Sequence, residues 1–294
     1  MTSESPKFEP VEVAGSGAQV DVATDVVFGR AGRSDLLLDL CRPAGRRPSA
    51  LPIVVFIHGG GWHGGDKESY RDPALRVASR GYLCASIDYR LAGQAPFPAA
   101  LEDCNCAVRW LRAHAAECGG DPNRVAAWGH SAGGHLAAMV ALTPGEFEGD
   151  GGWAGLPSGL RCALCYSTPF DLAAPMQHLG VAVMQFLGTV AADRASPMSY
   201  VVNGAPPFLV CHGDQDDLVP VEQSDRFVAA MRDAGAPIEY IRVHGAGHDL
   251  AQNGEELLAS ALRFLERQAR ATGGGASGQG QEPAVPVPTS KRKK

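Results

Sequence analysis

The amino-acid sequence predicts an α/β fold, in which a mostly parallel sheet of eight strands carries helices on both faces. From the third apolar run onward, short strand-like runs alternate with helical segments, as in a parallel sheet. The distinctive motifs also come directly after strands, at the edge where such sheets bind ligands. The eight predicted strands cover residues 20–28, 35–41, 53–57, 82–88, 124–128, 162–166, 208–212 and 238–243.

Segments between these strands have the spacing of amphipathic helices. In residues 98–116 apolar side chains recur every three or four positions, and Pro98 suits the first turn. This face predicts a helix that packs on the sheet. Its apolar positions are Leu101, Cys104, Val108, Leu111 and Ala115.

Length and composition are those of one globular domain. The chain has 294 residues, of which 45% are hydrophobic and 20% are charged, so it can bury one large core. We expect a folded domain over residues 20–271, preceded by a flexible segment at residues 1–19. Residues 272–294 are rich in Gly and Pro and end in a basic cluster, so this tail is predicted to be disordered.

Charge, hydropathy and cysteine placement narrow the class of protein further. A net charge of −6 argues against a nucleic-acid partner, because no folded basic face would neutralise phosphates. The N-terminal residues lack a signal-peptide pattern and no apolar run has membrane-spanning length, so we expect a soluble, cytoplasmic protein. Most of the eight cysteines lie in apolar runs typical of buried thiols. Cys162 and Cys165 have metal-like spacing but no second pair, so no metal is expected.

One segment predicts a nucleophile. Gly129-His130-Ser131-Ala132-Gly133 follows a strand-like run and precedes a helix-like run. In this context the G-x-S-x-G pattern forms a strained strand-to-helix turn that exposes the serine, and its glycines leave room for the neighbouring strand and helix. Ser131 is therefore the candidate nucleophile, and it requires a base and an oxyanion site.

A second glycine motif follows the strand at residues 53–57. His58-Gly59-Gly60-Gly61-Trp62 leaves backbone N–H groups uncovered, as the stabilisation of an oxyanion requires. We assign the N–H groups of Gly60, Gly61 and Ala132 as oxyanion donors. The alternatives are a plain flexible turn and a phosphate loop, and the Asp66-Lys67 that follows does not fit a phosphate loop.

A histidine downstream is the candidate base. Only His244 and His248 follow the acidic loop after the strand at residues 208–212. His244 ends a strand-like run, whereas His248 lies beyond a Gly-Ala-Gly segment on a loop that is free to reach Ser131. This placement favours His248.

The residues alone do not identify the carboxylate that partners the candidate base. Asp214, Asp216 and Asp217 crowd one loop, and Asp214 competes with Asp216 as the partner of the histidine. Three carboxylates could also form a metal site, but the pattern does not fit a calcium loop. The alternative is therefore that these are solvated loop acids without a catalytic role.

With these motifs the chain resembles α/β-hydrolase esterases. It is similar to the hormone-sensitive-lipase-like carboxylesterases and especially to the bacterial esterases related to feruloyl and acetyl-xylan esterases. The combination of motifs is specific where each alone is not, and it covers about residues 20–270. The matching segments are His58–Trp62 with Gly65-Asp66-Lys67, Asp88–Leu91, Pro96–Ala99, Glu102–Cys104, Gly129–Gly134, His212–Pro220 and Gly247-His248.

The resemblance implies an α/β-hydrolase fold and a serine carboxylesterase that works through an acyl-enzyme without a cofactor. In that group the acid is the fifth residue of the His-Gly segment, which falls on Asp216. The implied triad is Ser131, Asp216 and His248, and the implied substrate is a small-molecule ester with a short acyl group. Relatives also include arylformamidases, so formamide or amide hydrolysis is an alternative. A peptidase and a non-catalytic ligand-binding relative are the others. Asp88, Arg90, Glu102 and Asp103 resemble scaffold residues that pair to hold loops.

The substrate pocket is the part that the sequence specifies least. Residues 171–200 are predicted to be a cap insertion over the site, and they form either an apolar lid or a core helix. Trp62, His130 and Met184 are the candidate pocket-lining residues. No heptad or exposed apolar stripe marks an interface, and a homodimer is compatible with the sequence.

Overall fold

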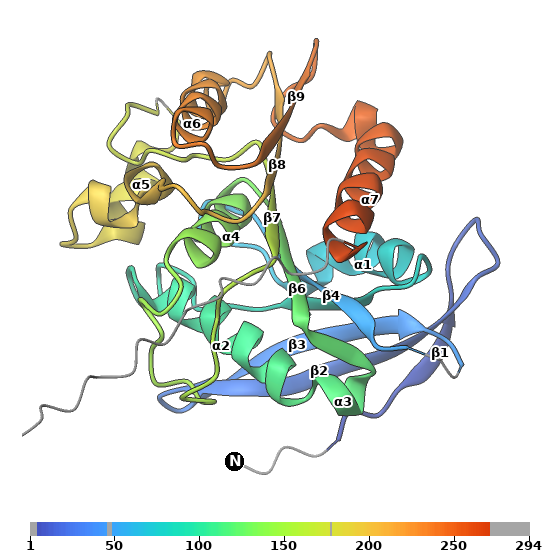
Figure 1. The fold of residues 1–294 in the computed structure, drawn as a ribbon. Helices are drawn as coiled ribbons and strands as arrows, with labels where there is room; N and C mark the ends of the chain where they lie inside the picture. The colour runs from blue at the N-terminus through green and yellow to red at the C-terminus, as the bar shows by residue number, and fades with distance from the viewer. Residues whose placement is uncertain (1–4, 46–48, 177, 271–294) are drawn as a thin grey trace, which may run out of the picture.

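The computed structural model describes residues 5–45, 49–176 and 178–270, so the tail predicted to be disordered, residues 272–294, lies outside the described residues. Within them the chain builds one sheet of nine strands in the order β1-β2-β3-β5-β4-β6-β7-β8-β9 (Figure 1). The strands are β1 (Glu9–Glu12), β2 (Gln19–Ala31), β3 (Ser34–Pro43), β4 (Leu51–Ile57), β5 (Leu83–Ile87), β6 (Gly120–His130), β7 (Cys162–Tyr166), β8 (Phe208–Gly213) and β9 (Ile238–Val243).

The sheet is antiparallel at one edge and parallel through the rest. β1, β2 and β3 pair antiparallel in series, and β3 also pairs antiparallel with β5. From β5 through β4, β6, β7, β8 and β9 all pairings are parallel. The predicted mostly parallel sheet is confirmed, and each of the eight predicted strands has a counterpart in it.

β1 is the strand that the sequence analysis missed, and it corrects the predicted count and the predicted flexible segment at residues 1–19. Residues Glu9–Glu12 pair antiparallel with β2, with Val11 opposite Val20. Three of its four residues are exposed and the fourth is half-buried, so the strand carries no apolar alternation. An edge strand of this kind is held by backbone hydrogen bonds to its neighbour, which leave no hydrophobic pattern in the sequence.

Helices cover both faces of the sheet (Figure 1). Val54 and Phe56 of β4 face the core beneath α1 (Arg71–Ala78) and α7 (Gly254–Arg270), whereas Ile53 and Val55 face the core beneath α2 (Ala99–Ala113), α4 (Ala132–Leu142) and α6 (Glu222–Asp233). None of the described helices combines the length and the apolar character that crossing a bilayer requires. The shorter elements are α3 (Ala115–Cys118), α5 (Gly180–Leu187), η1 (Lys67–Tyr70), η2 (Ala192–Ala195), η3 (Pro197–Tyr200) and η4 (Ala251–Asn253).

α2 confirms the helix predicted over residues 98–116. Leu101, Cys104, Val108 and Leu111 are each at most 1% exposed, and they pack in the core beneath this helix. The structure also buries all eight cysteines as free thiols.

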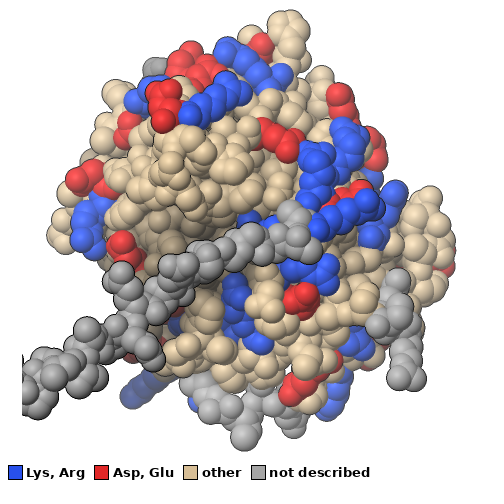
Figure 2. All heavy atoms as spheres, viewed as in Figure 1, with Lys and Arg blue, Asp and Glu red and all other residues tan. Residues whose placement is uncertain are grey.

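Several charged side chains fasten loops. Arg90 lies 2.8 Å from Asp103 and 3.1 Å from Glu102, so these residues pair as the resemblance implied. The buried ammonium of Lys67 lies 2.9 Å from both Asp25 and Asp39, which ties the segment after the glycine motif to the antiparallel edge. On the face seen in Figure 2, basic side chains lie close to acidic ones in several places.

The turn between β6 and α4 is fixed by close backbone packing. Ser131 has φ 56° and ψ −122°, a conformation that non-glycine residues rarely adopt. A Cβ added at Gly129 would lie 2.2 Å from the backbone of Gly133, and one added at Gly133 would lie 1.9 Å from the carbonyl oxygen of Ile57. The two glycines that flank the serine are therefore required by contact distances.

We predict that Gly133→Ala lowers the free energy of unfolding by about 3 kcal/mol or more, because the methyl group must displace backbone atoms of β4. Gly93→Ala is the matched control, since no heavy atom lies within 4 Å of the methyl group that it would add. Urea unfolding of both variants measures the difference. Equal stabilities would show that the turn does not need glycine at position 133.

Candidate active site

Ser131 stands at the carboxyl end of β6 and at the start of α4. Its amide donates to the carbonyl oxygen of Tyr166 at 2.8 Å, so the neighbouring strand β7 holds its backbone. The side chain makes no capping bond to its own helix. The hydroxyl is thus presented at the edge of the sheet where parallel strands end.

The glycine motif lies against this turn. A Cβ added at Gly59 would lie 3.5 Å from Cβ of Ser131, so the two motifs are neighbours. Gly60 and Gly61 have φ values of 109° and 60°, and the carbonyl oxygen of Gly60 accepts the amides of His63 and Gly64. Among the described residues no acceptor receives the amides of Gly60 or Gly61.

His58 anchors the glycine motif through contacts with Tyr89 and Gly59. Tyr89 donates its hydroxyl to the carbonyl oxygen of His58 at 2.9 Å and stacks on the imidazole at 4.2 Å between ring centres. Nδ1 of His58 lies 2.8 Å from the carbonyl oxygen of Gly59. Burial lowers the pKa of His58, so the imidazole is neutral and supports the loop.

The pairing of acid and histidine is the most specific geometry in the site. Nδ1 of His248 lies 2.8 Å from Oδ2 of Asp216. The other oxygen of Asp216 accepts the amides of Leu218 at 3.0 Å and Val219 at 2.8 Å. Burial would raise the pKa of Asp216, but these hydrogen bonds, with those from His212 and His248, outweigh burial and hold the pKa well below its usual range. The carboxylate is therefore charged.

Asp214, the competing acid, turns the other way. Its carboxylate lies 2.8 Å from Nδ1 of His244, and the His244 side chain is 96% exposed. The Asp214–His244 pair therefore sits at the surface, whereas the Asp216 carboxylate faces inward toward His248.

His248 approaches the serine through its own backbone. Nε2 of His130, the residue before Ser131, lies 2.7 Å from the carbonyl oxygen of His248, and the two imidazole centres are 4.7 Å apart. A hydrogen bond between the Ser131 hydroxyl and His248 is not among the contacts of the described residues. In serine hydrolases without substrate this contact is often long and tightens in the substrate complex.

His212 is the residue that sequence reasoning missed. It is fully buried, and its Nε2 lies 3.1 Å from Oδ2 of Asp216 and 2.9 Å from the carbonyl oxygen of Val219. Nδ1 lies 2.6 Å from the hydroxyl of Ser224, which fixes the ring. Its position four residues before Asp216 on the same strand-to-loop segment was the available signal. His212 orients the carboxylate that contacts His248.

The three pocket-lining residues predicted from the sequence lie in different surroundings. Trp62 has a positive φ of 62° and is fully buried, and its ring stacks on Phe186 with ring centres 4.5 Å apart. Met184 is 64% exposed on the outer face of α5. His130 does line a cavity, together with Gly59.

Leu179 and α5 lie over the glycine motif. A Cβ added at Gly61 would lie 3.8 Å from Ala182 and 4.0 Å from Leu179, so α5 and the residue before it lie above this loop. Val183, Phe186 and Leu187 of α5 are buried, whereas Val181 and Met184 are exposed. The helix therefore packs into the core on one side and faces solvent on the other.

No metal centre is found in the described part of the chain, where no group of three or more His, Cys, Asp and Glu side chains could hold an ion. Burial raises the pKa of the Cys162 and Cys211 thiols to about 12, so these thiols are protonated and poor metal ligands.

Proteins of known identity resemble the chain over most of its length. A family model described as BD-FAE matches residues 38–231. The chain belongs to the BD-FAE family. Esterase LipQ of Mycobacterium tuberculosis is 35% identical to it over 246 residues, which are 78% of this chain and 58% of that protein. This BD-FAE chain thus spans a little over half the length of that relative.

Solved structures resemble the BD-FAE chain in fold. Thermogutta terrifontis esterase 2 phosphonylated by sarin has a TM-score of 0.77 at 29% identity and covers 87% of this chain and 96% of its own. The butyrate-bound form of that esterase has a TM-score of 0.74 at 30% identity and covers 86% of this chain and 94% of its own. The fold is therefore the α/β-hydrolase fold of esterases, as the resemblance implied.

Two buried histidines and the half-buried His130 link the stability of the site to pH. Burial lowers the pKa values of His58, His130 and His135, that of His135 to about 4. An unfolded histidine has a pKa of about 6.5. Below that value the unfolded chain binds more protons than the folded chain. Stability is therefore complete above about pH 6.5 and is lost as the pH falls toward the folded pKa values.

We predict that His135→Gln flattens this pH dependence. His135 accepts from the Trp62 indole at 3.3 Å and lies 2.6 Å from the carbonyl oxygen of Ala195, and a neutral amide side chain cannot titrate. Between about pH 6 and pH 5 the variant should lose about 1.4 kcal/mol less per pH unit than the wild type in urea unfolding. The exposed His244→Gln is the control, and an unchanged slope in His135→Gln would contradict the prediction.

Proposed function

We propose that this chain is a serine carboxylic ester hydrolase that works through an acyl-enzyme. The observation that carries the proposal is the 2.8 Å contact between Nδ1 of His248 and the charged Asp216. The backbone carbonyl of His248 is in turn hydrogen-bonded to His130, the residue before Ser131. A nucleophile, a base and an orienting carboxylate on the loops of one sheet edge form the constellation that activates a serine.

The first step is attack on the ester carbonyl. Because Nδ1–H of His248 donates to Asp216, the lone pair of the neutral imidazole is on Nε2. Nε2 takes the hydroxyl proton of Ser131 as Oγ bonds to the carbonyl carbon. Asp216 then stabilises the imidazolium without accepting its proton.

The negative charge that develops on the carbonyl oxygen needs donors that are already in position. The amides of Gly60, Gly61 and Ala132 are the proposed donors, and the first two have no acceptor among the described residues. His248 next gives its proton to the leaving alcohol, and the acyl group stays on Ser131. A water molecule repeats the sequence and releases the carboxylic acid.

Relatives favour esters over amides as the substrate class. LipQ is named an esterase, and the solved esterase 2 structure holds butyrate. We therefore propose short acyl esters as substrates. Leu179 and Ala182 lie near Gly61, which gives the carbonyl end of the substrate an apolar neighbour.

We predict that Ser131→Ala lowers kcat/KM on p-nitrophenyl acetate and butyrate by about 10⁴-fold or more, because the nucleophile is removed while the fold is kept. Ser260→Ala, whose hydroxyl bonds only within α7, is the matched control and should keep full activity. Steady-state rates and thermal unfolding measure both variants. Hydrolysis by a folded Ser131→Ala protein at a rate near that of the wild type would refute the nucleophile.

We predict a similar contrast between the two loop acids. Asp216→Asn should lower kcat by about 10³-fold to 10⁴-fold, since an amide at this position favours the wrong histidine tautomer. Asp214→Asn should change kcat by less than about 3-fold, because its partner His244 is at the surface. The opposite ranking in a p-nitrophenyl butyrate assay would assign the acid to Asp214.

A further inference from the structure

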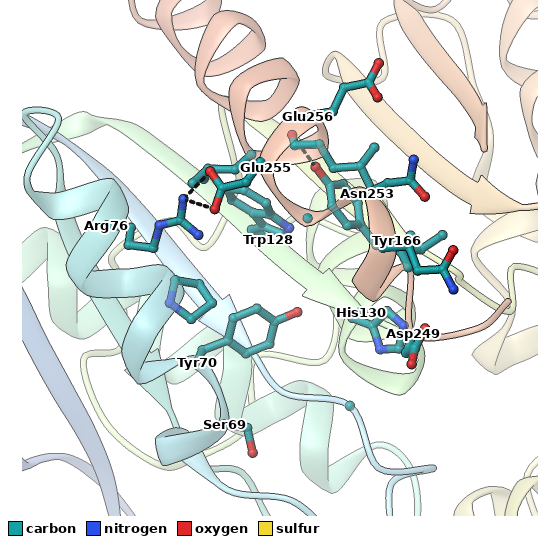
Figure 3. Close-up of a pocket in the computed structure, with 17 residues that line it drawn as sticks. Ser69, Tyr70, Arg76, Trp128, His130, Tyr166, Asp249, Asn253, Glu255 and Glu256 are labelled. Atoms are coloured by element: carbon teal, nitrogen blue, oxygen red, sulfur yellow. Dashed lines mark hydrogen bonds and ion pairs between the residues drawn. The ribbon is translucent and has the colours of Figure 1, made fainter. Parts of the chain in front are cut away.

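A cavity lies beside the candidate active site, on the α1 and α7 side of the sheet (Figure 3). Its volume is about 740 Å³, within the range of pockets that hold small molecules. η1 and α1 form one wall and the start of α7 forms the other (Figure 3). The proposed mechanism uses none of the side chains in these walls.

Aromatic rings line this cavity. Tyr70, Trp128 and Tyr166 all contribute to it. Phe56 links two of them, with ring centres 5.2 Å from Tyr70 and 5.4 Å from Trp128, and Trp128 lies 5.4 Å from Tyr166. The rings are therefore held in place by packing and form a rigid apolar surface suited to a flat or cyclic group.

Two hydrogen-bond donors in the cavity lack protein partners. Trp128 is 5% exposed, yet its Nε1–H donates to no acceptor among the described residues, and Figure 3 shows the nitrogen facing the cavity. The Tyr70 hydroxyl is likewise without a partner in the described part of the chain, whereas Tyr166 donates to the carbonyl oxygen of Leu257 at 3.3 Å. Both donors are open to the cavity, so a ligand that carries an acceptor can hydrogen-bond to them there.

The charges around the cavity exclude an anionic ligand. Glu255, Glu256 and Asp249 line it, and the guanidinium of Arg76 is bonded to Glu255 at 2.7 Å and 2.6 Å. The acidic groups outnumber the single basic one, so a carboxylate or phosphate would be repelled. A cation without an acceptor atom would leave the Trp128 and Tyr70 donors unsatisfied. A neutral group with an oxygen acceptor avoids repulsion by the acidic groups and can accept hydrogen bonds from Trp128 and Tyr70.

The cavity adjoins three loops of the proposed machinery, those of the glycine motif, Ser131 and His248. Gly59 and His130 line it, and they are the residues next to Gly60 and Ser131. Asp249 and Leu250, which follow His248, also line it. His248 protonates the leaving alcohol in the proposed mechanism, so the alcohol portion of an ester lies on the histidine side.

We propose that this cavity binds the alcohol portion of the ester and selects a neutral, ring-shaped alcohol that carries an oxygen acceptor. The inference rests on the proposed function for the identity of the ligand. The site itself is defined by Tyr70, Trp128 and the start of α7.

Kinetics of matched acetate esters test this selection. The esters are ethyl acetate, phenyl acetate and 4-methoxyphenyl acetate, and the variants are Tyr70→Phe and Trp128→Phe. Each variant removes a donor that is worth about 1 kcal/mol, so kcat/KM on 4-methoxyphenyl acetate should fall about 5-fold through KM. On ethyl acetate, the ratio of the wild-type kcat/KM to that of each variant should stay near one. Tyr240→Phe, a tyrosine bonded to Asp225 away from the cavity, is the control.

Four results would overturn the selection. One is an equal loss on all three esters, and another is no loss on any of them. The third is a variant that changes the preference for acyl length, tested with p-nitrophenyl acetate and butyrate, since the cavity would then hold the acyl group. Preference for acetylcholine over its neutral analogue 3,3-dimethylbutyl acetate would show that the cavity selects positive charge and would contradict a neutral ligand.

Equilibrium binding separates this proposal from the proposed function. Calorimetry should detect 4-methoxyphenol binding to Ser131→Ala as it does to the wild type, and binding should weaken about 5-fold in Tyr70→Phe. If the chain hydrolyses no ester but still binds the phenol in this pattern, the cavity assignment stands and the function fails. If esters are hydrolysed and the phenol does not bind, the cavity assignment fails alone.

Discussion

The buried carboxylate of Asp216 holds the candidate site together. It receives His248, His212 and the amides of Leu218 and Val219, so a charge that would be costly without donors is fully hydrogen-bonded. Because β8 and β9 are parallel neighbours, the loops that follow them emerge side by side, and the carboxylate fastens one to the other. The position of His248 beside the Ser131 turn follows from this attachment.

Backbone packing determines the other half of the site. The turn at Ser131 is strained, and it persists because Gly129 and Gly133 let β4, β6 and α4 approach within contact distance. The glycine motif rests on the same turn and is anchored by His58, while α5 lies above it. Rigid elements thus hold the proposed oxyanion donors, which is what electrostatic stabilisation of a transition state requires. The aromatic cavity opens beside this frame, where Gly59 and His130 line it.

Structural features that depend on short segments could be predicted from the sequence, whereas features that depend on contacts between distant residues could not. Strand and helix periodicity predicted the sheet, and the glycine spacing predicted the turn, because both are properties of short segments. Asp214 and Asp216 follow the same strand, so only the fold distinguishes the inward carboxylate from the one that meets His244. Trp62 stacks on Phe186, far away along the chain, and the sequence does not reveal this contact. The cavity at Tyr70 combines residues of η1, β6, β7 and α7 and has no sequence signature.

Covalent labelling decides whether this geometry activates a serine. A fluorophosphonate reacts with a serine whose hydroxyl is deprotonated by a neighbouring imidazole, and the product is stable enough for intact-mass analysis and peptide mapping. A single adduct on Ser131 that is absent from His248→Asn is the predicted result. A folded wild-type protein that remains unlabelled, or that carries the adduct on another residue, would contradict the assignment of Ser131 and His248 as nucleophile and base.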